Sequence, residues 1–140
     1  MVVQPSVIEG DCYSDARGSL FFNNEFDASQ IKRIYIINNI DLEFVRGWQG
    51  HKIEQRWFSA ISGKFKIDLI KIDNWDQPTK GLKVFSFVIN SDKLNVIHVP
   101  QGYVSSIQSL ESNSKLLIMA DYLLGEIEDE YRYHIDYFKI

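Results

Sequence analysis

Two polar side chains with catalytic potential lie two residues apart in the segment RGWQGHKIEQ, residues 46–55. Alternate side chains of an extended strand point to the same face, so Gln49 and His51 are expected to share one face, with Gln55 also on it if the strand continues. Of these three residues, only His51 exchanges a proton near neutral pH. The segment therefore predicts a strand that presents one imidazole beside amide groups.

The elements that must position this segment are strands. Short runs rich in β-branched and aromatic residues, separated by turn residues, cover residues 31–37, 57–61, 65–72, 84–89, 94–99 and 116–119. Many short strands with frequent turns predict an all-β sandwich or jelly roll. Only residues 125–137, where acidic residues precede an aromatic cluster, have a pattern that suits a short helix.

Two details of the strand pattern predict local structure. Ser62-Gly63 divides two apolar runs, so residues 57–72 are expected to form a hairpin. Polar and apolar residues alternate from Lys64 to Leu69, but Ile70 and Ile72 then fall on the polar parity. That change indicates either a bulge or a strand that is buried on both faces.

Length and charge exclude several classes of protein. With 140 residues, 45% of them hydrophobic, the chain is expected to form one domain over residues 1–140. Its 15 Lys and Arg against 19 Asp and Glu argue against nucleic acid or an anionic membrane as the main partner. No apolar run approaches the roughly 18 residues of a membrane helix, and the first residues lack a secretory pattern, so a cytoplasmic protein is expected. Cys12, the single cysteine, excludes an internal disulfide.

Five short motifs carry a family resemblance by their order: DARGSL at 15–20, IKRIY at 31–35, RGWQGHKIEQ at 46–55, VPQGY at 99–103 and ADY at 120–122. Through them the chain resembles the WxcM-like cupins that act on deoxysugar nucleotides. These include the dTDP-4-dehydrorhamnose 3,5-epimerases and the dTDP-6-deoxyhexose 3,4-ketoisomerases. The resemblance implies an RmlC-like cupin, an all-β jelly-roll barrel, with a short C-terminal tail that is helical or irregular.

The metal-ligand positions of a general cupin are altered in this chain. Two histidines, a glutamate and a third histidine are expected there, whereas this sequence has Gln49, His51, Gln55 and Ser105. Amide and hydroxyl groups bind first-row divalent metals poorly beside a lone imidazole. We therefore expect no metal site and no cofactor.

The resemblance assigns the proton transfer to His51. The base histidine of the 3,5-epimerases falls at Gln49, and their tyrosine acid has no counterpart in residues 116–119. The 3,4-ketoisomerases resemble the chain better, through residues 31–35 and through His51-Lys52. In a 4-keto sugar, one histidine can remove the proton on carbon 3 and return a proton at carbon 4. Gln49, Arg33 or Tyr35 would donate hydrogen bonds to the enediolate.

The expected site has two parts. The catalytic residues are His51, Gln49 and Tyr35, and no metal is among them. The substrate-binding residues are Arg17, Arg33, Arg46, Lys52, Gln55, Tyr103 and Ser105. Arg17, Arg46 and Lys52 are candidates for the diphosphate, since guanidinium and ammonium groups bind phosphate oxygens. For Arg46, a surface ion pair is nearly as good an interpretation as ligand binding.

Two classes of function remain open from the sequence. The first is a metal-independent isomerase or epimerase that acts on a nucleotide-linked, dTDP-type 4-keto-6-deoxy sugar in cell-surface polysaccharide biosynthesis. The second is a catalytically inactive module that binds a sugar nucleotide, or an accessory subunit beside an acyltransferase or aminotransferase. The expected partners are the nucleotide sugar and a second copy of the chain. In such a homodimer the N-terminal strands would pair, and Arg17 would reach the ligand of the neighbouring subunit.

Overall fold

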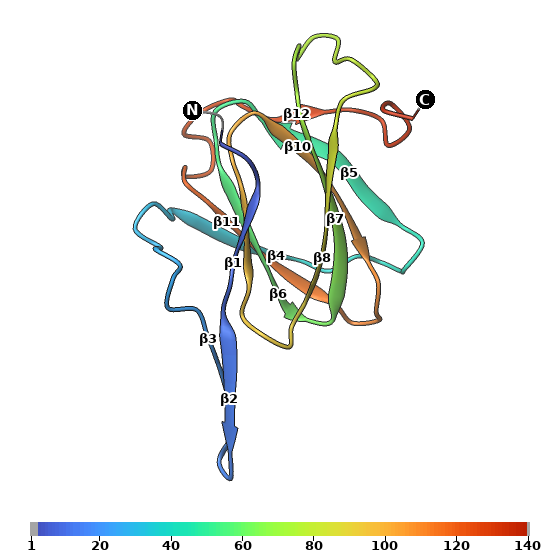
Figure 1. Ribbon diagram of the computed structural model, residues 1–140. Helices are drawn as coiled ribbons and strands as arrows, with labels where there is room; N and C mark the ends of the chain where they lie inside the picture. Colours follow the sequence, from blue (N-terminus) through green and yellow to red (C-terminus); the bar gives the residue numbers. More distant parts are fainter. Residues whose placement is uncertain (1–2, 140) are drawn as a thin grey trace.

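The computed structural model describes residues 3–139, which form strands and loops and contain no helix, hence no helix that could span a membrane (Figure 1). Short β-branched and aromatic runs favour strands over helices, as expected. The strands are β1 (Ser6–Ile8), β2 (Asp11–Asp15), β3 (Gly18–Phe22), β4 (Arg33–Ile37), β5 (Val45–His51), β6 (Arg56–Ser62), β7 (Lys64–Lys71), β8 (Val84–Asn90), β9 (Val96–Val99), β10 (Tyr103–Ser109), β11 (Lys115–Ala120) and β12 (Tyr131–Arg132).

Two antiparallel sheets form a jelly-roll barrel. One sheet has the strand order β1-β9-β6-β11-β4 and the other has the order β12-β5-β10-β7-β8. The remaining two strands, β2 and β3, pair only with each other and project from the barrel as a hairpin (Figure 1). The predicted all-β cupin architecture is confirmed.

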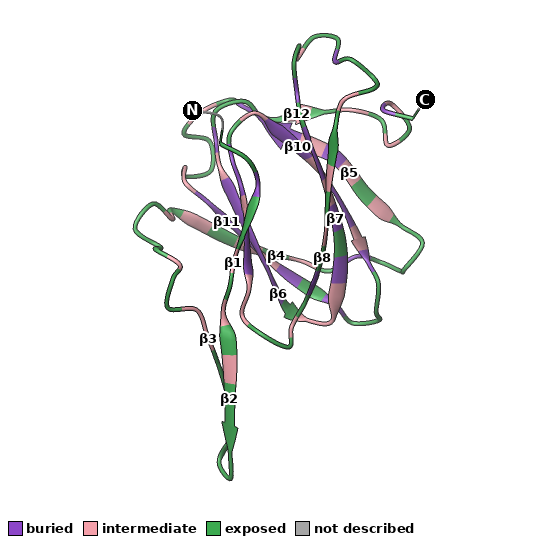
Figure 2. Ribbon diagram, viewed as in Figure 1, coloured by how far each residue is buried: buried purple, intermediate pink, exposed green. Residues whose placement is uncertain are grey.

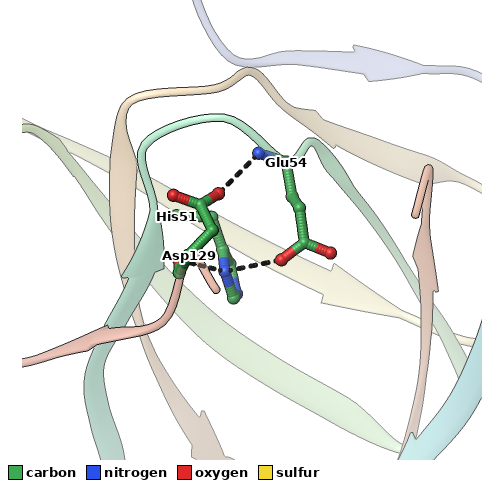
Figure 3. Close-up of side chains that lie close together, drawn as sticks. All are labelled: His51, Glu54 and Asp129. Carbon is green, nitrogen blue, oxygen red and sulfur yellow. Dashed lines mark hydrogen bonds and ion pairs between the residues drawn. The ribbon is translucent and has the colours of Figure 1, made fainter. Parts of the chain in front are cut away.

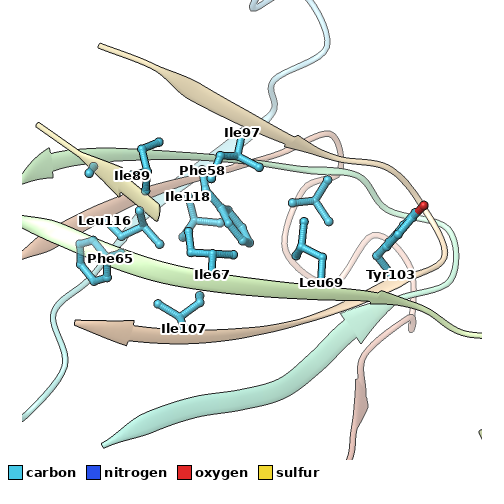
Figure 4. Packing of buried hydrophobic residues seen from close by; sticks show 12 residues of the cluster. Phe58, Phe65, Ile67, Leu69, Ile89, Ile97, Tyr103, Ile107, Leu116 and Ile118 are labelled. Carbon is cyan, nitrogen blue, oxygen red and sulfur yellow. The ribbon is translucent and has the colours of Figure 1, made fainter. Parts of the chain in front are cut away.

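The core lies between the two sheets. Phe58, Leu116 and Ile118 face it from one sheet, and Phe65 and Ile67 face it from the other (Figure 4). All five are at most 3% exposed. Burial concentrates on the barrel strands, whereas the β2–β3 hairpin is largely exposed (Figure 2). The interior is therefore apolar through most of the barrel, and polar side chains face it where the cavity lies.

The predicted hairpin over residues 57–72 is wrong. β6 pairs with β9 and β11 in one sheet, whereas β7 pairs with β8 and β10 in the other. Only Gly63, with φ of +76°, separates the two strands. Its α-carbon packs so tightly against Ser114 that an added Cβ would lie 2.0 Å from Oγ of that serine. One glycine in this conformation turns the chain from sheet to sheet, so both apolar runs face the shared core.

The parity change at Ile70 comes from burial of both faces of β7. The register of β7 with β8 and with β10 is continuous, so the strand carries no bulge. Ile70 is 1% exposed and lies in a second cluster on the outer face of the sheet, with Trp48 and Phe138. Phe138 belongs to the C-terminal tail, which is irregular apart from β12. The tail therefore covers the outer face of this sheet.

Candidate active site

The polar segment of β5 faces a polar segment of β10. In the antiparallel ladder, Gln49 pairs with Ser105 and His51 pairs with Tyr103, so all four residues have the same parity. Between them, Gly50 lies so close to β10 that an added Cβ would be 2.2 Å from the carbonyl oxygen of Tyr103. Alternation along two paired strands thus brings the four predicted residues to one face.

This face lines a cavity of about 500 Å³ at the open end of the barrel, with a narrow inner extension of about 40 Å³. Both sheets contribute to it: β4 and β6 from one side, β5 and β10 from the other, and the segment 123–131 at the mouth. The polar residues that line the cavity or its extension are Arg33, Tyr35, Arg46, Gln49, His51, Glu54, Arg56, Tyr103, Ser105, Glu128, Asp129, Glu130 and Tyr131.

His51 is held through one of its two ring nitrogens. Nδ1 lies 2.9 Å from the carbonyl oxygen of Asp129 and 3.1 Å from Oε2 of Glu54 (Figure 3). A carbonyl and a carboxylate can only accept, so Nδ1 carries the proton of the neutral ring. Nε2 then carries the lone pair, and it has no hydrogen-bond partner within residues 3–139. The arrangement fits a general base at the cavity wall.

Electrostatics keep this imidazole in its basic form. Burial lowers the pKa of His51, and the positive charge of Arg56 lowers it further, while Glu54 and the Asp129 carbonyl oppose both effects. His51 is 9% exposed, so the desolvation of its charged form is substantial. At neutral pH the ring is therefore unprotonated at Nε2 and able to accept a proton.

Asp129 fixes the loop between β5 and β6. Its carboxylate accepts hydrogen bonds from the backbone N–H groups of Lys52, Ile53 and Glu54, at 3.0, 2.8 and 2.8 Å. The residue is 4% exposed. Its carbonyl binds His51, as described above, so one residue of the tail positions both the imidazole and the loop that carries Glu54.

His51, Glu54 and Asp129 also place potential metal ligands within 4.8 Å of one another. Both carboxylate oxygens of Asp129 already accept backbone N–H groups, and the nitrogen of His51 in this cluster is the protonated Nδ1. The carboxylate of Glu54 lies between Nδ1 of His51 and the guanidinium of Arg56, 3.4 Å away. This donor set suits a network that orients His51 better than a metal centre, since a metal requires a deprotonated nitrogen.

Gln49 is oriented by the tail. Its amide nitrogen donates to Oε1 of Glu130, which also accepts a hydrogen bond from Arg132 at 3.0 Å. A carboxylate can only accept, so the Gln49 amide must turn its nitrogen toward Glu130. The amide oxygen and the second N–H of Gln49 remain for a ligand.

Two arginines face the cavity from the other sheet. Arg33 lies over the ring of Tyr35, with its Cζ 4.6 Å from the ring centroid. Arg56 is buried, and its Nη1 donates to the carbonyl oxygen of Gln55 at 3.2 Å. Arg46 reaches the inner extension from β5, where its Nε donates to Asn39 at 3.1 Å. The cavity therefore contains several positive groups beside its acidic mouth.

The fold has counterparts among known proteins. The model of the family described as FdtA: WxcM-like, C-terminal, matches residues 4–140. This chain belongs to that family. Among solved structures, a 3,4-ketoisomerase from Helicobacter canadensis aligns with a TM-score of 0.72 and 20% identity, over 99% of this chain and 97% of that one.

Two further structures share the fold. A mutant of the 3,4-ketoisomerase QdtA from Thermoanaerobacterium thermosaccharolyticum, in complex with TDP-4-keto-6-deoxyglucose, aligns with a TM-score of 0.72 and 21% identity, over 99% of this chain and 94% of that one. The RmlC epimerase of Mycobacterium tuberculosis aligns with a TM-score of 0.74 and 13% identity, over 94% of this chain and 70% of that one. At such identities the likeness shows the fold alone.

One curated sequence matches only in part. The isoleucine–tRNA ligase of Rickettsia prowazekii (strain Madrid E) is 31% identical over 64 residues, 46% of this chain. The chain spans only 6% of the length of that ligase. So local a likeness says nothing about the activity of the FdtA-family chain.

Three residues expected at the ligand do not line the cavity of this FdtA-family chain. Gln55 does not share the face of Gln49 and His51, because β5 ends at His51 and the chain turns before β6. Its side chain binds Asp121 at 3.2 Å and His98 at 2.6 Å. Lys52 lies in the exposed turn after β5, and Arg17 pairs with Asp15 at 2.7 Å near the tip of the projecting hairpin.

The two other histidines, His98 and His134, have local partners. His98 stacks on Trp57, with ring centroids 5.2 Å apart, and contacts Gln55. His134 is exposed and lies 3.8 Å from Asp136. Neither residue lines the cavity in the described part of the chain.

Six polar cavity residues were missed from the sequence: Glu54, Arg56, Glu128, Asp129, Glu130 and Tyr131. Glu54 and Arg56 stand three and five residues after His51, and charged residues are rarely buried, so nothing in the sequence indicated that they would line the cavity. Asp129 and Glu130 lie more than 75 residues from His51 in the chain, and no local pattern predicts their approach.

Proposed function

We propose that this protein is a metal-independent isomerase that moves the ketone of a nucleotide-linked 4-keto-6-deoxy sugar between carbons 4 and 3. The observation that carries the proposal is the state of His51: its Nδ1 is held by two acceptors, and its Nε2 is unpaired at the wall of the cavity. A neutral imidazole with one free nitrogen can take a proton and give it back. No other histidine lines the cavity within residues 3–139.

The reaction needs one base and one site for negative charge. Nε2 of His51 removes the hydrogen on carbon 3, which the neighbouring ketone acidifies, and the electron pair becomes the enediolate. The hydroxyl proton on the carbon 3 oxygen passes to the carbon 4 oxygen within the enediolate. The imidazolium then returns its proton to carbon 4, and the ketone is left on carbon 3. Glu54, 3.1 Å from Nδ1, stabilises the imidazolium that exists between the two steps.

The substrate class follows from the relatives and the cavity together. A 3,4-ketoisomerase of the same fold is described in complex with TDP-4-keto-6-deoxyglucose, and another structure of that enzyme is in complex with TDP. In this chain Arg33 and Arg46 line the cavity and suit a diphosphate, since arginine binds phosphate oxygens with two parallel bonds. Tyr35 and Tyr103 offer ring faces for the sugar or the base. A product of this class belongs in the assembly of cell-surface polysaccharides.

The test is to incubate the protein with dTDP-4-keto-6-deoxyglucose in deuterated water and follow the sugar by NMR. We expect a 3-keto product and deuterium at the reacting carbons. His51→Asn should lower kcat by roughly 10²–10⁴-fold, the usual contribution of a general base. His98→Asn is the matched control and should keep its activity, because His98 lies outside the cavity. If the intact protein forms no product and takes up no deuterium, the proposal is refuted.

A second candidate is a module that binds the sugar nucleotide without converting it. Gln49 favours it, since an amide that cannot transfer protons occupies the histidine position of the related epimerases. Binding of dTDP by calorimetry, together with no deuterium uptake, would support this alternative.

We further propose that the protein works as a homodimer. The projecting hairpin exposes Tyr13, Leu20 and Phe21, which are 58%, 62% and 47% exposed. Such apolar side chains on a free strand pair suit pairing with a second copy, and Arg17 near the tip would then approach the ligand of its partner. Light scattering should give twice the monomer mass; a monomer would contradict this assembly.

A further inference from the structure

Arg56 is the buried charge that the proposed reaction has not yet used. It comes from the start of β6, is 6% exposed, and lines both the cavity and its inner extension. Burying a guanidinium is costly unless its donors are paired. Its neighbour in the chain, Trp57, points to the opposite face of β6 and packs in an apolar cluster, so strand alternation directs Arg56 inward.

Only one side of this guanidinium is occupied. Nη1 donates to the carbonyl oxygen of Gln55 at 3.2 Å and lies 3.4 Å from Oε1 of Glu54. Nε is buried and has no hydrogen-bond partner, and Nη2 has none within residues 3–139. Nε and Nη2 form the edge with which arginine binds two oxygens side by side. Nη2 is thus a free donor on a buried cation at the cavity wall, with the covered Nε beside it, and this is a binding position for an anion.

The anion that the proposed reaction forms has the matching shape. Removal of the carbon 3 proton gives a planar enediolate whose negative charge is shared by two neighbouring oxygens. We propose that Arg56 is a further catalytic residue, whose free Nη2, with Nε beside it, binds the oxygens of this enediolate while His51 holds the proton. This role rests on the proposed isomerase function.

The position of Glu54 supports a division of labour. Its carboxylate lies between the two cationic groups, with Oε2 3.1 Å from Nδ1 of His51 and Oε1 3.4 Å from Nη1 of Arg56. It therefore occupies one side of each group. The free Nε2 of His51 and the free Nη2 of Arg56 are left for the substrate. Of the enediolate donors expected from the sequence, Gln49, Arg33 and Tyr35, Gln49 already donates one N–H to Glu130.

The experiment compares Arg56→Met and Arg56→Lys with the intact protein. The readouts are the rate of deuterium uptake at carbon 3 of dTDP-4-keto-6-deoxyglucose and the affinity for dTDP by calorimetry. For Arg56→Met we expect the rate to fall by roughly 10²–10³-fold, the usual effect of removing an oxyanion donor, with dTDP affinity within about threefold. Arg56→Lys keeps the charge but not the paired edge, and should recover only part of the rate. Lys66→Met, an exposed cation on the outer side of β7, is the matched control and should match the intact protein.

The possible outcomes separate this role from the proposed function. An inactive intact protein would overturn both. If the intact protein is active and Arg56→Met takes up deuterium at the same rate, only the role of Arg56 is overturned. The same holds if Arg56→Met loses dTDP affinity in parallel with its rate. If Arg56→Met does not fold because Glu54 is left unpaired, the double variant Glu54→Gln/Arg56→Met removes both charges, and Arg56→Lys keeps them. Deuterium uptake at the intact rate in either folded variant would then overturn the role.

Discussion

Two regions of the molecule meet at His51, and they are built in different ways. The ladder of β5 and β10 is regular, and it brings Gln49, His51, Ser105 and Tyr103 to one face by simple alternation. The tail segment 123–131 is irregular up to the start of β12, yet it supplies the acceptors that orient Gln49 and His51 of β5. The regular strands therefore choose which residues face the cavity, and the tail determines which of their atoms are free to react.

The same contrast holds on the outer face of the sheet. Trp48 and Ile70 point away from the cavity and pack against Phe138 of the tail, and the indole Nε1 of Trp48 donates to the carbonyl oxygen of Ile135 at 3.1 Å. Side chains of opposite parity on β5 thus contact the same tail, one on each side of the sheet. Packing of the outer face holds the tail in the position where Asp129 can bind His51.

The largest effect is expected from removing the link between the two regions. Asp129→Ala leaves the backbone N–H groups of Lys52, Ile53 and Glu54 without their charged acceptor, so the free energy of unfolding should fall by about 3 kcal/mol. Urea denaturation measures this change. Isomerase activity should fall as well, because the loop that carries Glu54 loses its anchor. Asp136→Ala, in an exposed part of the same tail, is the control and should leave the denaturation midpoint unchanged.

A different result would change the comparison itself. If Asp129→Ala were as stable as the intact protein, the tail would be a passive cover, and the β5 ladder alone would hold His51. Retention of the Glu54 position would then have to come from its contact with Arg56.

This contrast also explains which features the sequence could predict. That Gln49 and His51 share one face follows from the period of two in a strand, and the jelly roll follows from the spacing of short strands and turns. The β6–β7 connection was misjudged because Ser62-Gly63 suits a hairpin turn, whereas the turn is a single glycine whose positive φ directs β7 into the other sheet. Asp129 and Glu130 could not be predicted, since their contacts with β5 depend on how the tail packs on Trp48 and Ile70.

A smaller effect is expected at the second link, between Gln49 and Glu130. Gln49→Ala removes one hydrogen-bonding side chain from the cavity, so kcat/KM should fall by roughly tenfold. Glu130→Gln keeps an oxygen that can accept from Gln49, and should stay within about threefold of the intact protein. Steady-state kinetics on the 4-keto sugar nucleotide measures both. If Glu130→Gln lost as much kcat/KM as Gln49→Ala, the site would need the charge of Glu130 and not only an acceptor that orients Gln49.

The smallest effect is expected in the pH dependence of the intact site. Burial lowers the pKa of His51 below its ordinary value of about 6.5, so kcat/KM should hold constant as the pH falls through 6.5 and decline only at lower pH. Glu54 raises this pKa and Arg56 lowers it, so the acid limb should move to lower pH in Glu54→Gln and to higher pH in Arg56→Met. Stability should follow the same sign: a histidine whose pKa falls on folding contributes stability that is fully present above about pH 6.5 and is lost as the pH falls below 6.5 and through the lowered pKa. His51→Asn should abolish this part of the pH dependence of unfolding. If the acid limb moved the same way in both charge variants, the Asp129 carbonyl of the tail would control the protonation of His51 more strongly than Glu54 and Arg56 do.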